Sequence, residues 1–317
     1  MAPTPPNDNL IAGIDIGGTK VGACVGHPNG VVLAAETSPT DRDPAAALDR
    51  ARDTAVRLAD GKPIARVGIA VPGPFDRRTR RFLDPPNMPT WHGFDVGTWA
   101  DRSFSCPTRC MNDANAAALS EWLWGSAAGV DTLIFLTVST GLGAGIVVDG
   151  RPIEGAMGLA GEVGRVRLAA HGPVGFGAYG TAEGFASGPG IEQAAAAEVL
   201  RCCQAGEGTA MADASPLDAR AVCAHAQAGD AAALRVTTAA AGRLGQLIAI
   251  LANVLEPDAV VLGTIAAAYP DLFVPEATRA AHADTVRATA AKMRIEASTL
   301  DERWARQALA AAARARD

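Results

Sequence analysis

Short apolar runs broken by glycine and proline turns fill the first third of the chain. Their length and composition are typical of strands, and turns at Gly17-Gly18 and Pro28-Asn29-Gly30 separate the first three, at 10–16, 20–26 and 31–36. A helical period follows over 43–59, with Asp43 and Pro44 as its cap and first-turn residues, and strands at 65–73 and 108–113 alternate with further helices. The order strand, strand, strand, helix, strand, helix, strand, helix predicts an α/β fold.

A similar order begins again after residue 130. Residues 131–140 predict a strand, the glycine-rich residues 141–145 a turn, and 146–150 a return strand. A long helix over about 230–255, a strand at 257–263 and a C-terminal helix complete the chain. Each half thus has a strand, a Gly/Thr-rich turn and a return strand, which predicts two lobes.

Composition fits a two-lobed globular protein in the cytoplasm. Of the 317 residues, 49% are apolar and 20% charged, and the net charge of −6 disfavours binding to nucleic acid or an anionic membrane. The six cysteines include no CxxC pair, which indicates buried or semi-buried free thiols. The N-terminus lacks the features of a secretory signal, and the apolar stretch 244–255 is too short to span a bilayer.

The first glycine turn carries candidate chemistry in Asp15-Ile16-Gly17-Gly18-Thr19-Lys20. It has neither the G-x-G-x-x-G nor the P-loop spacing, and no helix follows. Glycines still allow backbone N–H groups to approach phosphate oxygens, while Thr19 and Lys20 add a hydroxyl and a cation. Asp15 would hold Mg²⁺ through water. The alternative is an ordinary Gly-Gly hairpin turn.

The segment Ser139-Thr140-Gly141-Leu142-Gly143-Ala144-Gly145 repeats this arrangement in the second half. By itself it is equally consistent with a turn of small packing residues. Two such hairpins in equivalent positions favour phosphate binding.

Asp113 follows a strand and opens a helix. It is a candidate helix N-cap and a candidate general base for a hydroxyl nucleophile, and the two roles are compatible. A helix N-terminus keeps a carboxylate ionised and lowers its basicity, which phosphoryl transfer tolerates because its loose transition state depends mainly on positioning. Asn112 beside it would bond a substrate hydroxyl.

Taken together, these motifs resemble the ROK family, which contains bacterial sugar kinases and sugar-responsive repressors. The resemblance covers roughly residues 10–303 and rests on six segments in order: DIGGTK, VPGP (71–74), PNMPTW (86–91), NDANAAALSE, STGLGAGIV and GLAGEVG (158–164). It implies a two-lobed actin-like ATPase (ribonuclease H-like) fold, each lobe a mixed sheet flanked by helices. Residues 1–118 and 304–317 would form the smaller lobe and 119–303 the larger, with a cleft between them. Phosphate is held in this fold by one hairpin per lobe.

The resemblance also implies residue roles. Asp113 would be the catalytic base. The expected sugar ligands are Gly73, Asn87, Asn112, Glu162, Arg165 and Glu183. The phosphates, Mg²⁺ and the adenosine would be bound by Asp15, Gly17, Gly18, Thr19, Lys20, Thr140, Gly141, Gly143 and Gly263.

Two departures from the family pattern change the expectations. Many members have a histidine and a three-cysteine zinc loop, C-x-C-G-x-x-G-C, after the glutamate, but here Arg165 replaces the histidine, and Gly175, Gly177 and Thr181 fall near the cysteine positions. No structural zinc is expected, and Arg165 either points to solvent or bonds a sugar oxygen. At the adenosine site, Gly263 alone remains of the usual glycines. ATP is the expected donor, with polyphosphate as the alternative.

We therefore expect an ATP-dependent hexose kinase that phosphorylates a hydroxyl, with O6 as the expected position and the identity of the sugar open. The alternatives are an N-acetylmannosamine or N-acetylglucosamine kinase and a non-catalytic, sugar-sensing ROK protein. Family repressors carry a DNA-binding domain before the first hairpin, for which a hairpin starting near residue 10 leaves no room. The basic run 76–81 is expected at an exposed hairpin tip. A homodimer is expected from the resemblance.

Overall fold

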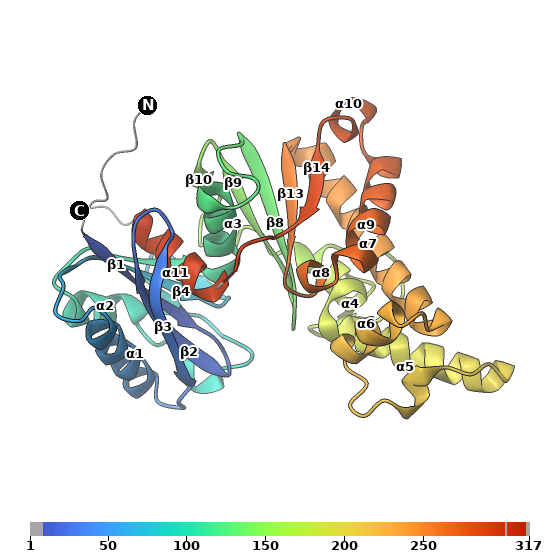
Figure 1. Cartoon of the computed structure of the whole chain (residues 1–317), viewed down its shortest axis with the longest axis horizontal. Coiled ribbons are helices and arrows are strands. Elements are labelled where there is room, and N and C mark those ends of the chain that lie inside the picture. Colours follow the sequence, from blue (N-terminus) through green and yellow to red (C-terminus); the bar gives the residue numbers. More distant parts are fainter. Residues whose placement is uncertain (1–8, 302, 315–317) are drawn as a thin grey trace. The chain divides into compact units, whose positions relative to one another are not determined.

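The computed structural model describes residues 9–301 and 303–314, which fold as two compact units (Figure 1). By sequence, unit 1 comprises Met1–Gly129, Gly145–Gly161 and Leu300–Asp317, and unit 2 comprises Val130–Ala144 and Glu162–Thr299. The lobe boundaries and the cleft expected from the resemblance stay predictions.

Unit 1 is built on a five-stranded mixed sheet in the order β3-β2-β1-β4-β7. Strands β1, β2 and β3 are antiparallel neighbours, and β1, β4 and β7 are parallel. The carboxyl ends of these three parallel strands therefore meet at one edge of the sheet. The bounds are β1 Leu10–Ile16, β2 Lys20–Gly26, β3 Val32–Pro39, β4 Ile64–Val71 and β7 Thr108–Asn112.

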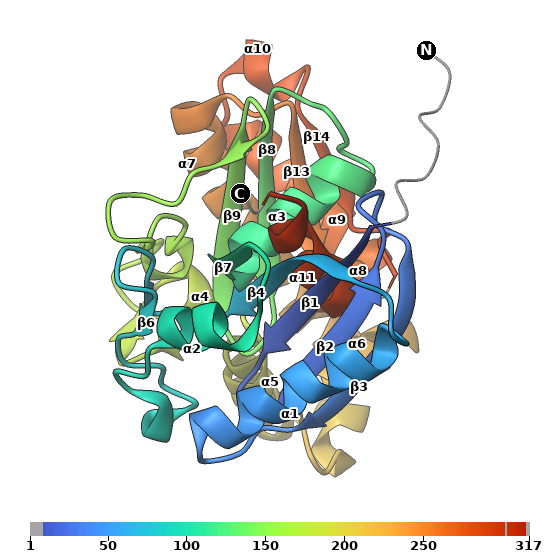
Figure 2. The same cartoon turned by 90° about the vertical axis from the view of Figure 1, so that its left-hand side faces the viewer.

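Helices cover both faces of this sheet. Helix α1 (Pro44–Leu58) begins after Asp43, whose side chain accepts a hydrogen bond from the Ala45 N–H, as the sequence predicted. It packs against the alternate side chains of β1 that include Ile14, and Figure 2 shows it lying across the strands. Helices α3 (Asp113–Trp124) and α11 (Arg303–Ala313) pack on the other face.

The contact of α11 with the sheet requires glycine at Gly68. A β-carbon at Gly68 would lie 2.1 Å from the Ala308 carbonyl oxygen and 2.2 Å from the Ala312 nitrogen. Real β-carbons do not approach backbone atoms so closely, so the helix rests directly on the backbone of β4.

The segment after β4 forms a small hairpin of β5 (Phe75–Asp76) and β6 (Arg81–Phe82), followed by η1 (Pro89–Trp91) and α2 (Val96–Ser103). The basic run lies at the exposed tip of this hairpin, so that prediction is confirmed. Its arginines pair within unit 1, since Arg81 contacts Asp95 at 2.7 Å and Arg80 contacts Asp101.

A second five-stranded sheet repeats the strand order of the first, as β10-β9-β8-β13-β14. A hairpin again precedes two strands parallel to its first member, β13 and β14. Residues Gly145–Gly161, which include β10 and the end of β9, group with unit 1, and the other strands of this sheet belong to unit 2. The bounds are β8 Thr132–Val138, β9 Leu142–Val148, β10 Arg151–Pro152, β13 Ala259–Gly263 and β14 Arg294–Ala297.

The return strand β9 begins four residues earlier than the sequence predicted, at Leu142 rather than 146. Gly143 and Gly145 therefore lie in the strand, and the prediction of a turn over 141–145 is wrong. Gly145 is a glycine because the strand packs closely against α3, not because the chain turns there: a β-carbon at Gly145 would lie 2.1 Å from the Ala114 carbonyl oxygen of α3.

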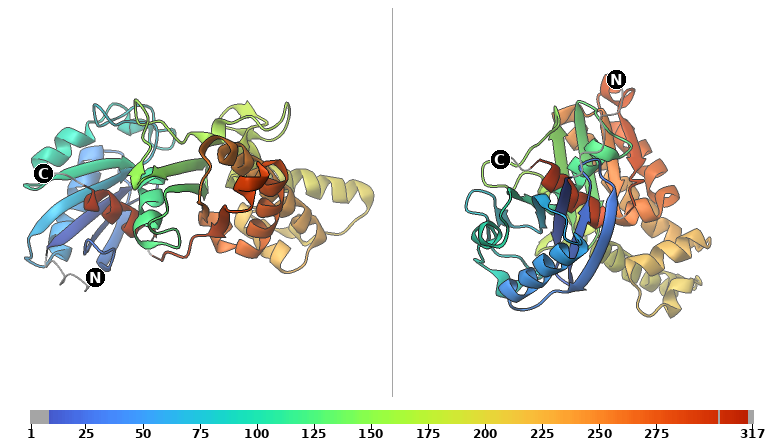
Figure 3. Two further views of the ribbon diagram at one scale, coloured as in Figure 1. Left: turned by 90° about the horizontal axis from the view of Figure 1, so that it is seen from above. Right: turned by 60° about the vertical axis from the view of Figure 1, so that its left-hand side comes forward.

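Unit 2 is otherwise largely helical. The long helix α7 packs side by side with α9 (Figures 1 and 3). It is long and apolar enough to cross a membrane by length and composition, but half of its most apolar window is buried, as in the core helix of a globular unit. The bounds are η2 Val163–Arg165, β11 Val174–Gly175, β12 Ala178–Tyr179, α4 Ala182–Ala186, α5 Gly188–Ala205, η3 Ala210–Asp213, α6 Ala219–Gln227, α7 Ala231–Leu255, α8 Thr264–Ala268, α9 Pro270–Asp284 and α10 Arg287–Ala290.

All six cysteines are free thiols. The prediction of buried or semi-buried thiols holds for five of them and is wrong for Cys203, which is exposed. Cys203 lies on the solvent side of α5, and its neighbour Cys202 faces the core.

Candidate functional site

Two carboxylates gather at the carboxyl edge of the sheet in unit 1. Asp15 is the penultimate residue of β1, Asn112 is the last residue of β7, and Asp113 is the first residue of α3. The parallel strands β1, β4 and β7 bring their ends together, and the charge of Asp113 acts directly on the Asp15 carboxyl. The edge formed by the ends of parallel strands is where open α/β sheets bind ligands.

The N-cap of α3 is Asn112 rather than Asp113, so the prediction of an Asp113 cap is wrong by one residue. Asn112 Oδ1 accepts from the N–H groups of Ala114 at 3.0 Å and Asn115 at 3.3 Å. Asp113 Oδ1 accepts from the Ala114 N–H at 2.8 Å. Capping occupies the oxygen of the Asn112 amide, so its Nδ2 is the group suited to a ligand oxygen.

Asp15 has an unusual titration. Its pKa is raised to about 7, mainly by burial; a hydrogen bond from Gln307 Nε2 to Asp15 Oδ1 opposes the rise, and the charge of Asp113 adds to it. Sequence reasoning missed Gln307, because a glutamine in a helix 292 residues away carries no local signal of this contact.

The turn of the first hairpin leaves backbone donors for a ligand. The Gly17 N–H donates to the Lys20 carbonyl at 2.9 Å, and Thr40 Oγ1 donates to the Gly17 carbonyl at 2.6 Å. The N–H groups of Gly18 and Thr19 find no acceptor among residues 9–301 and 303–314. Lys20 is exposed, so two amides and an ammonium group are available to an anion. Thr40 was not predicted from the sequence.

The segment that carries Asn87 lies against this turn. A β-carbon at Gly18 would be 3.1 Å from the Asn87 β-carbon, and Asn87 is exposed. Trp91 anchors this segment to the core of unit 1, since its side chain is 1% exposed and its Nε1 donates to the Asp41 carbonyl at 3.0 Å. Gly73 follows the end of β4, the strand next to β1.

In unit 2, Glu183 forms the centre of a second group of candidate residues. It lies in α4, is 7% exposed, and accepts a hydrogen bond at Oε2 from the Leu142 N–H at 3.1 Å. Three glycines line its carboxylate: a β-carbon would lie 2.8 Å from Oε2 at Gly141, 3.4 Å from Oε2 at Gly164 and 3.1 Å from Oε1 at Gly175. These close approaches explain why glycines surround the carboxylate.

The pKa of Glu183 is raised, mainly by burial, while the Leu142 N–H and the Arg165 charge oppose this and the charge of Glu162 adds to it. The three charged residues therefore lie close enough to interact. Glu162 is exposed, and Arg165 Nη1 donates to the Phe176 carbonyl at 3.0 Å. Arg165 thus bonds its own chain, and a contact with sugar stays a prediction.

The β11–β12 hairpin occupies the region where the sequence lacks the family cysteines. Arg167 Nη1 donates to the Tyr179 carbonyl at 2.6 Å, and Thr181 caps α4 by accepting from the Gly184 N–H. Within the described part of the chain, no group of three or more His, Cys, Asp or Glu is placed to hold a metal ion. The absence of zinc stays a prediction.

The loop between β8 and β9 resembles the first glycine turn in its hydrogen bonds. The Ser139 N–H donates to the Gly141 carbonyl at 2.9 Å, and the Ser139 carbonyl accepts from the Gly188 N–H at 2.7 Å. Thr140 is exposed, and its N–H makes no bond to any residue the structure describes. Gly143 lies beyond this loop, in β9.

At the end of β13, Gly263 is followed by Thr264 in a left-handed conformation with φ of 52°. This conformation favours glycine and is unusual for a β-branched residue. A hydrogen bond from Thr264 Oγ1 to the Val138 carbonyl helps to hold it. The structure thus places a non-glycine residue where the backbone geometry suits glycine.

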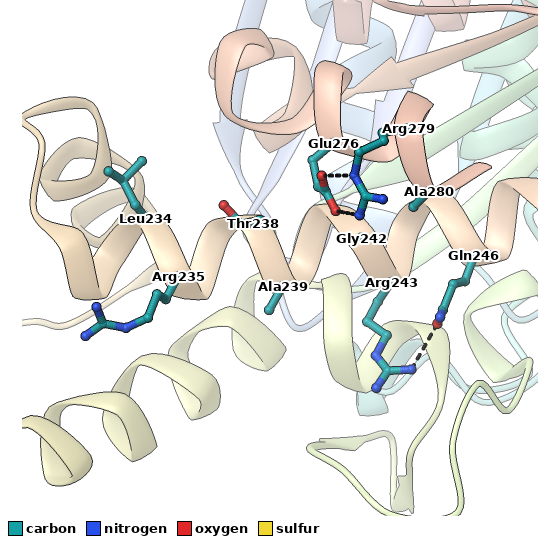
Figure 4. A pocket seen from close by; sticks show the side chains of 10 residues that line it. All are labelled: Leu234, Arg235, Thr238, Ala239, Gly242, Arg243, Gln246, Glu276, Arg279 and Ala280. Atoms are coloured by element: carbon teal, nitrogen blue, oxygen red, sulfur yellow. Dashed lines mark hydrogen bonds and ion pairs between the residues drawn. The ribbon is translucent and has the colours of Figure 1, made fainter. Parts of the chain in front are cut away.

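A groove of about 530 Å³ on α7 and α9 contains none of these residues (Figure 4). Its arginines already have partners: Arg279 contacts Glu276 at 2.6 Å, and Arg243 donates to Gln246 at 2.9 Å and lies 4.5 Å from the centre of the Phe185 ring. The groove is therefore not a candidate site for a sugar or for a phosphate group.

Three curated relatives are similar over much of the chain. A glucokinase from Streptomyces coelicolor is 30% identical over 258 residues, covering 80% of this chain and 81% of its own. An N-acetylmannosamine kinase from Citrobacter koseri is 33% identical over 255 residues, covering 79% and 81%. The bifunctional enzyme NanE/NanK from Brucella melitensis is 36% identical over 198 residues, which are 62% of this chain and only 34% of that protein.

Two solved structures of sugar kinases are also similar to this chain. A ROK hexokinase from Thermus thermophilus has a TM-score of 0.78 and 30% identity, covering 96% of this chain and 97% of its own. A ROK family glucokinase from Streptomyces griseus, solved with glucose and AMPPNP, has a TM-score of 0.79 and 25% identity, covering 96% and 98%. The ROK family model matches residues 11–314. The chain therefore belongs to the ROK family and has its actin-like ATPase fold.

Proposed function

We propose that the chain is an ATP-dependent hexose kinase, which transfers the γ-phosphoryl group of Mg·ATP to a sugar hydroxyl, with O6 as the expected acceptor. The observation that carries the proposal is the grouping of Asp15, Asp113 and the Gly17–Lys20 turn at one sheet edge in unit 1. Similarity to a glucokinase and to a ROK hexokinase supports the reaction class.

Asp113 would act as the general base. Its carboxylate accepts the proton of the sugar hydroxyl as that oxygen bonds to the γ-phosphorus and the bond from phosphorus to the β-phosphate oxygen breaks, releasing ADP. The proton on Asp113 is then lost to solvent. Mg²⁺, when bound with ATP, neutralises charge on the β- and γ-phosphates.

The other candidates would bind and orient the substrates. The free amides of Gly18 and Thr19, with Lys20, suit phosphate oxygens, and the Thr140 amide suits them likewise. Asn112 would donate from Nδ2 to a sugar oxygen because its Oδ1 caps α3. The sugar hydroxyls would be bound by Gly73, Asn87, Glu162 and Glu183. Arg165 would bond a sugar oxygen as well. Each such group discriminates one hydroxyl, since an unmatched partner is left unpaired.

An N-acetylmannosamine substrate is the second candidate, because the Citrobacter koseri kinase of that name is also similar over most of the chain. A screen of ADP release over glucose, mannose, fructose, N-acetylmannosamine and N-acetylglucosamine, ranked by kcat/KM, separates the two. The same screen with polyphosphate tests the donor.

The decisive variant is Asp113→Asn, which keeps the shape of the side chain and removes the base. We expect kcat to fall at least about 100-fold with the melting temperature nearly unchanged. A folded Asp113→Asn protein with normal turnover, or a wild-type protein that phosphorylates no sugar, would sink the proposal. A homodimer in the cytoplasm stays a prediction, which sedimentation analysis and cell fractionation would test.

A further inference from the structure

Gln307 is a polar residue on a helix that packs mainly through alanine side chains. Helix α11 buries Ala305, Ala308 and Leu309 fully against unit 1. Gln307 is half-buried and reaches the carboxyl edge of the sheet, where its Nε2 donates to Asp15 Oδ1. The C-terminal helix thus contributes directly to the group of Asp15 and Asp113.

The position of this amide is tightly fixed. The backbone of α11 rests on Gly68, and a β-carbon at Gly13 would lie 2.7 Å from the Ala308 β-carbon. The preceding residue, Arg306, donates to the Gly30 carbonyl at 2.8 Å. A side chain that starts from such a rigid point can hold its partner in one orientation.

Within the described part of the chain, Gln307 is the one side chain that donates a hydrogen bond to the Asp15 carboxylate. The other close charge is that of Asp113, which repels it. The amide therefore occupies Oδ1 and leaves Oδ2 as the oxygen suited to a ligand. A cation at Oδ2 would relieve the repulsion between the two carboxylates.

The donor set suits Mg²⁺ bound together with phosphates. Mg²⁺ is held by one or two carboxylates, substrate phosphates and water rather than by a complete protein cage. Asp15 supplies a carboxylate oxygen, and the amides of the Gly17–Lys20 turn lie next to β1, the strand that carries Asp15. The residues therefore fit a divalent cation that arrives with a nucleotide.

We propose that Gln307 is a positioning residue for this cation: it orients the Asp15 carboxylate so that Oδ2 binds the metal of the metal–nucleotide complex, directly or through water. The proposal rests on the proposed kinase function. It goes beyond it by assigning a role in metal binding to a residue of the C-terminal helix.

The test measures Mn²⁺ binding by electron paramagnetic resonance in the presence of AMPPNP, which needs no turnover. Gln307→Leu keeps the bulk of the side chain and removes the donor, and Gln307→Asn keeps an amide that is one carbon short. We expect both variants to weaken Mn²⁺ binding about 10-fold, while the sugar KM stays unchanged. The matched control is Gln204→Leu, the same substitution at an exposed position of α5.

Several outcomes would overturn the proposal. If Gln307→Leu and Gln307→Asn bind Mn²⁺ as tightly as the wild type, Gln307 does not position the metal ligand, even if the kinase function stands. If Mn²⁺ binding, sugar KM and melting temperature change together relative to Gln204→Leu, the residue has a structural role only. If the wild-type protein binds no Mn²⁺ with AMPPNP and phosphorylates no sugar, the proposed function fails and this inference fails with it.

Discussion

The Glu183 carboxylate lies so close to Gly141 that a β-carbon at Gly141 would be 2.8 Å from Glu183 Oε2. The neighbouring Leu142 N–H donates to the same oxygen. The loop after β8 therefore packs directly against the Glu183 carboxylate of α4, and this contact fixes the position of the carboxylate.

Gly141→Ala is expected to displace the Glu183 carboxylate and weaken sugar binding. The nearest atom to the new methyl group is the end of a flexible side chain, so the free energy of unfolding should change by less than about 1 kcal/mol. We expect the sugar KM to rise roughly 10-fold, because a ligand moved by a fraction of an ångström loses its hydrogen bond. Steady-state kinetics and thermal melting measure the two effects, and an unchanged KM would contradict this assignment of Glu183.

Asp15→Asn is expected to stabilise the fold above neutral pH. The pKa of Asp15 is raised from 3.8 to about 7, so the folded state disfavours its charged form. The contribution of Asp15 to the free energy of unfolding is therefore greatest below pH 3.8 and is lost as the pH rises through about 7. An asparagine, which cannot ionise, avoids the loss and should gain about 1–3 kcal/mol at pH 8.

The measurement for Asp15→Asn is denaturant unfolding of variant and wild type between pH 5 and 8. The stability difference should shrink steadily as the pH falls. An equal difference at every pH would mean that Asp15 is not the titrating group. The same variant should lose kinase activity, since it gives up the proposed metal ligand.

Much of the fold was predictable because it depends on local patterns. Apolar runs separated by a Gly-Gly turn and a Pro-Asn-Gly turn predicted the first three strands, and Asp43 before Pro44 predicted the start of α1; the structure confirms both. The prediction failed where the sequence allows two local structures: for the cap residue of α3 and for the glycines of residues 141–145. Asn112 and Asp113 are both good cap residues, and only the backbone geometry distinguishes them. Gly143 and Gly145 look like a turn, yet Gly145 is a strand residue packed against α3.

The site was predictable in so far as its residues lie next to glycine turns or strand ends. Its supporting contacts were not, because they join distant segments. Gln307 bonds Asp15 across 292 residues, and Thr40 bonds Gly17 across 23. Neither residue type signals such a partner, and tertiary packing alone brings them together.

Removal of metal ions is expected to leave the β11–β12 hairpin folded. Arg165 and Arg167 donate to the Phe176 and Tyr179 carbonyls of this hairpin, so side chains of the chain itself hold it. We expect EDTA to leave the melting temperature unchanged and elemental analysis to find far less than one zinc per chain. A melting temperature that falls with EDTA and recovers with Zn²⁺ would refute the prediction.

Gly68→Ala is expected to destabilise unit 1 severely. The new methyl group would lie 2.1 Å from the Ala308 carbonyl oxygen and 2.2 Å from the Ala312 nitrogen, and neither backbone atom can move without shifting α11. We expect a loss of about 3 kcal/mol or more, because the helix must separate from β1 and β4.

The control for Gly68→Ala is Gly208→Ala, where a β-carbon would meet no atom within 4 Å and which should change stability by less than about 0.5 kcal/mol. Denaturant unfolding of the two variants compares them directly. Because α11 carries Gln307, the Gly68 variant should also bind Mn²⁺ with AMPPNP more weakly under conditions where it remains folded. A Gly68→Ala protein as stable as Gly208→Ala would mean that α11 does not rest directly on β4.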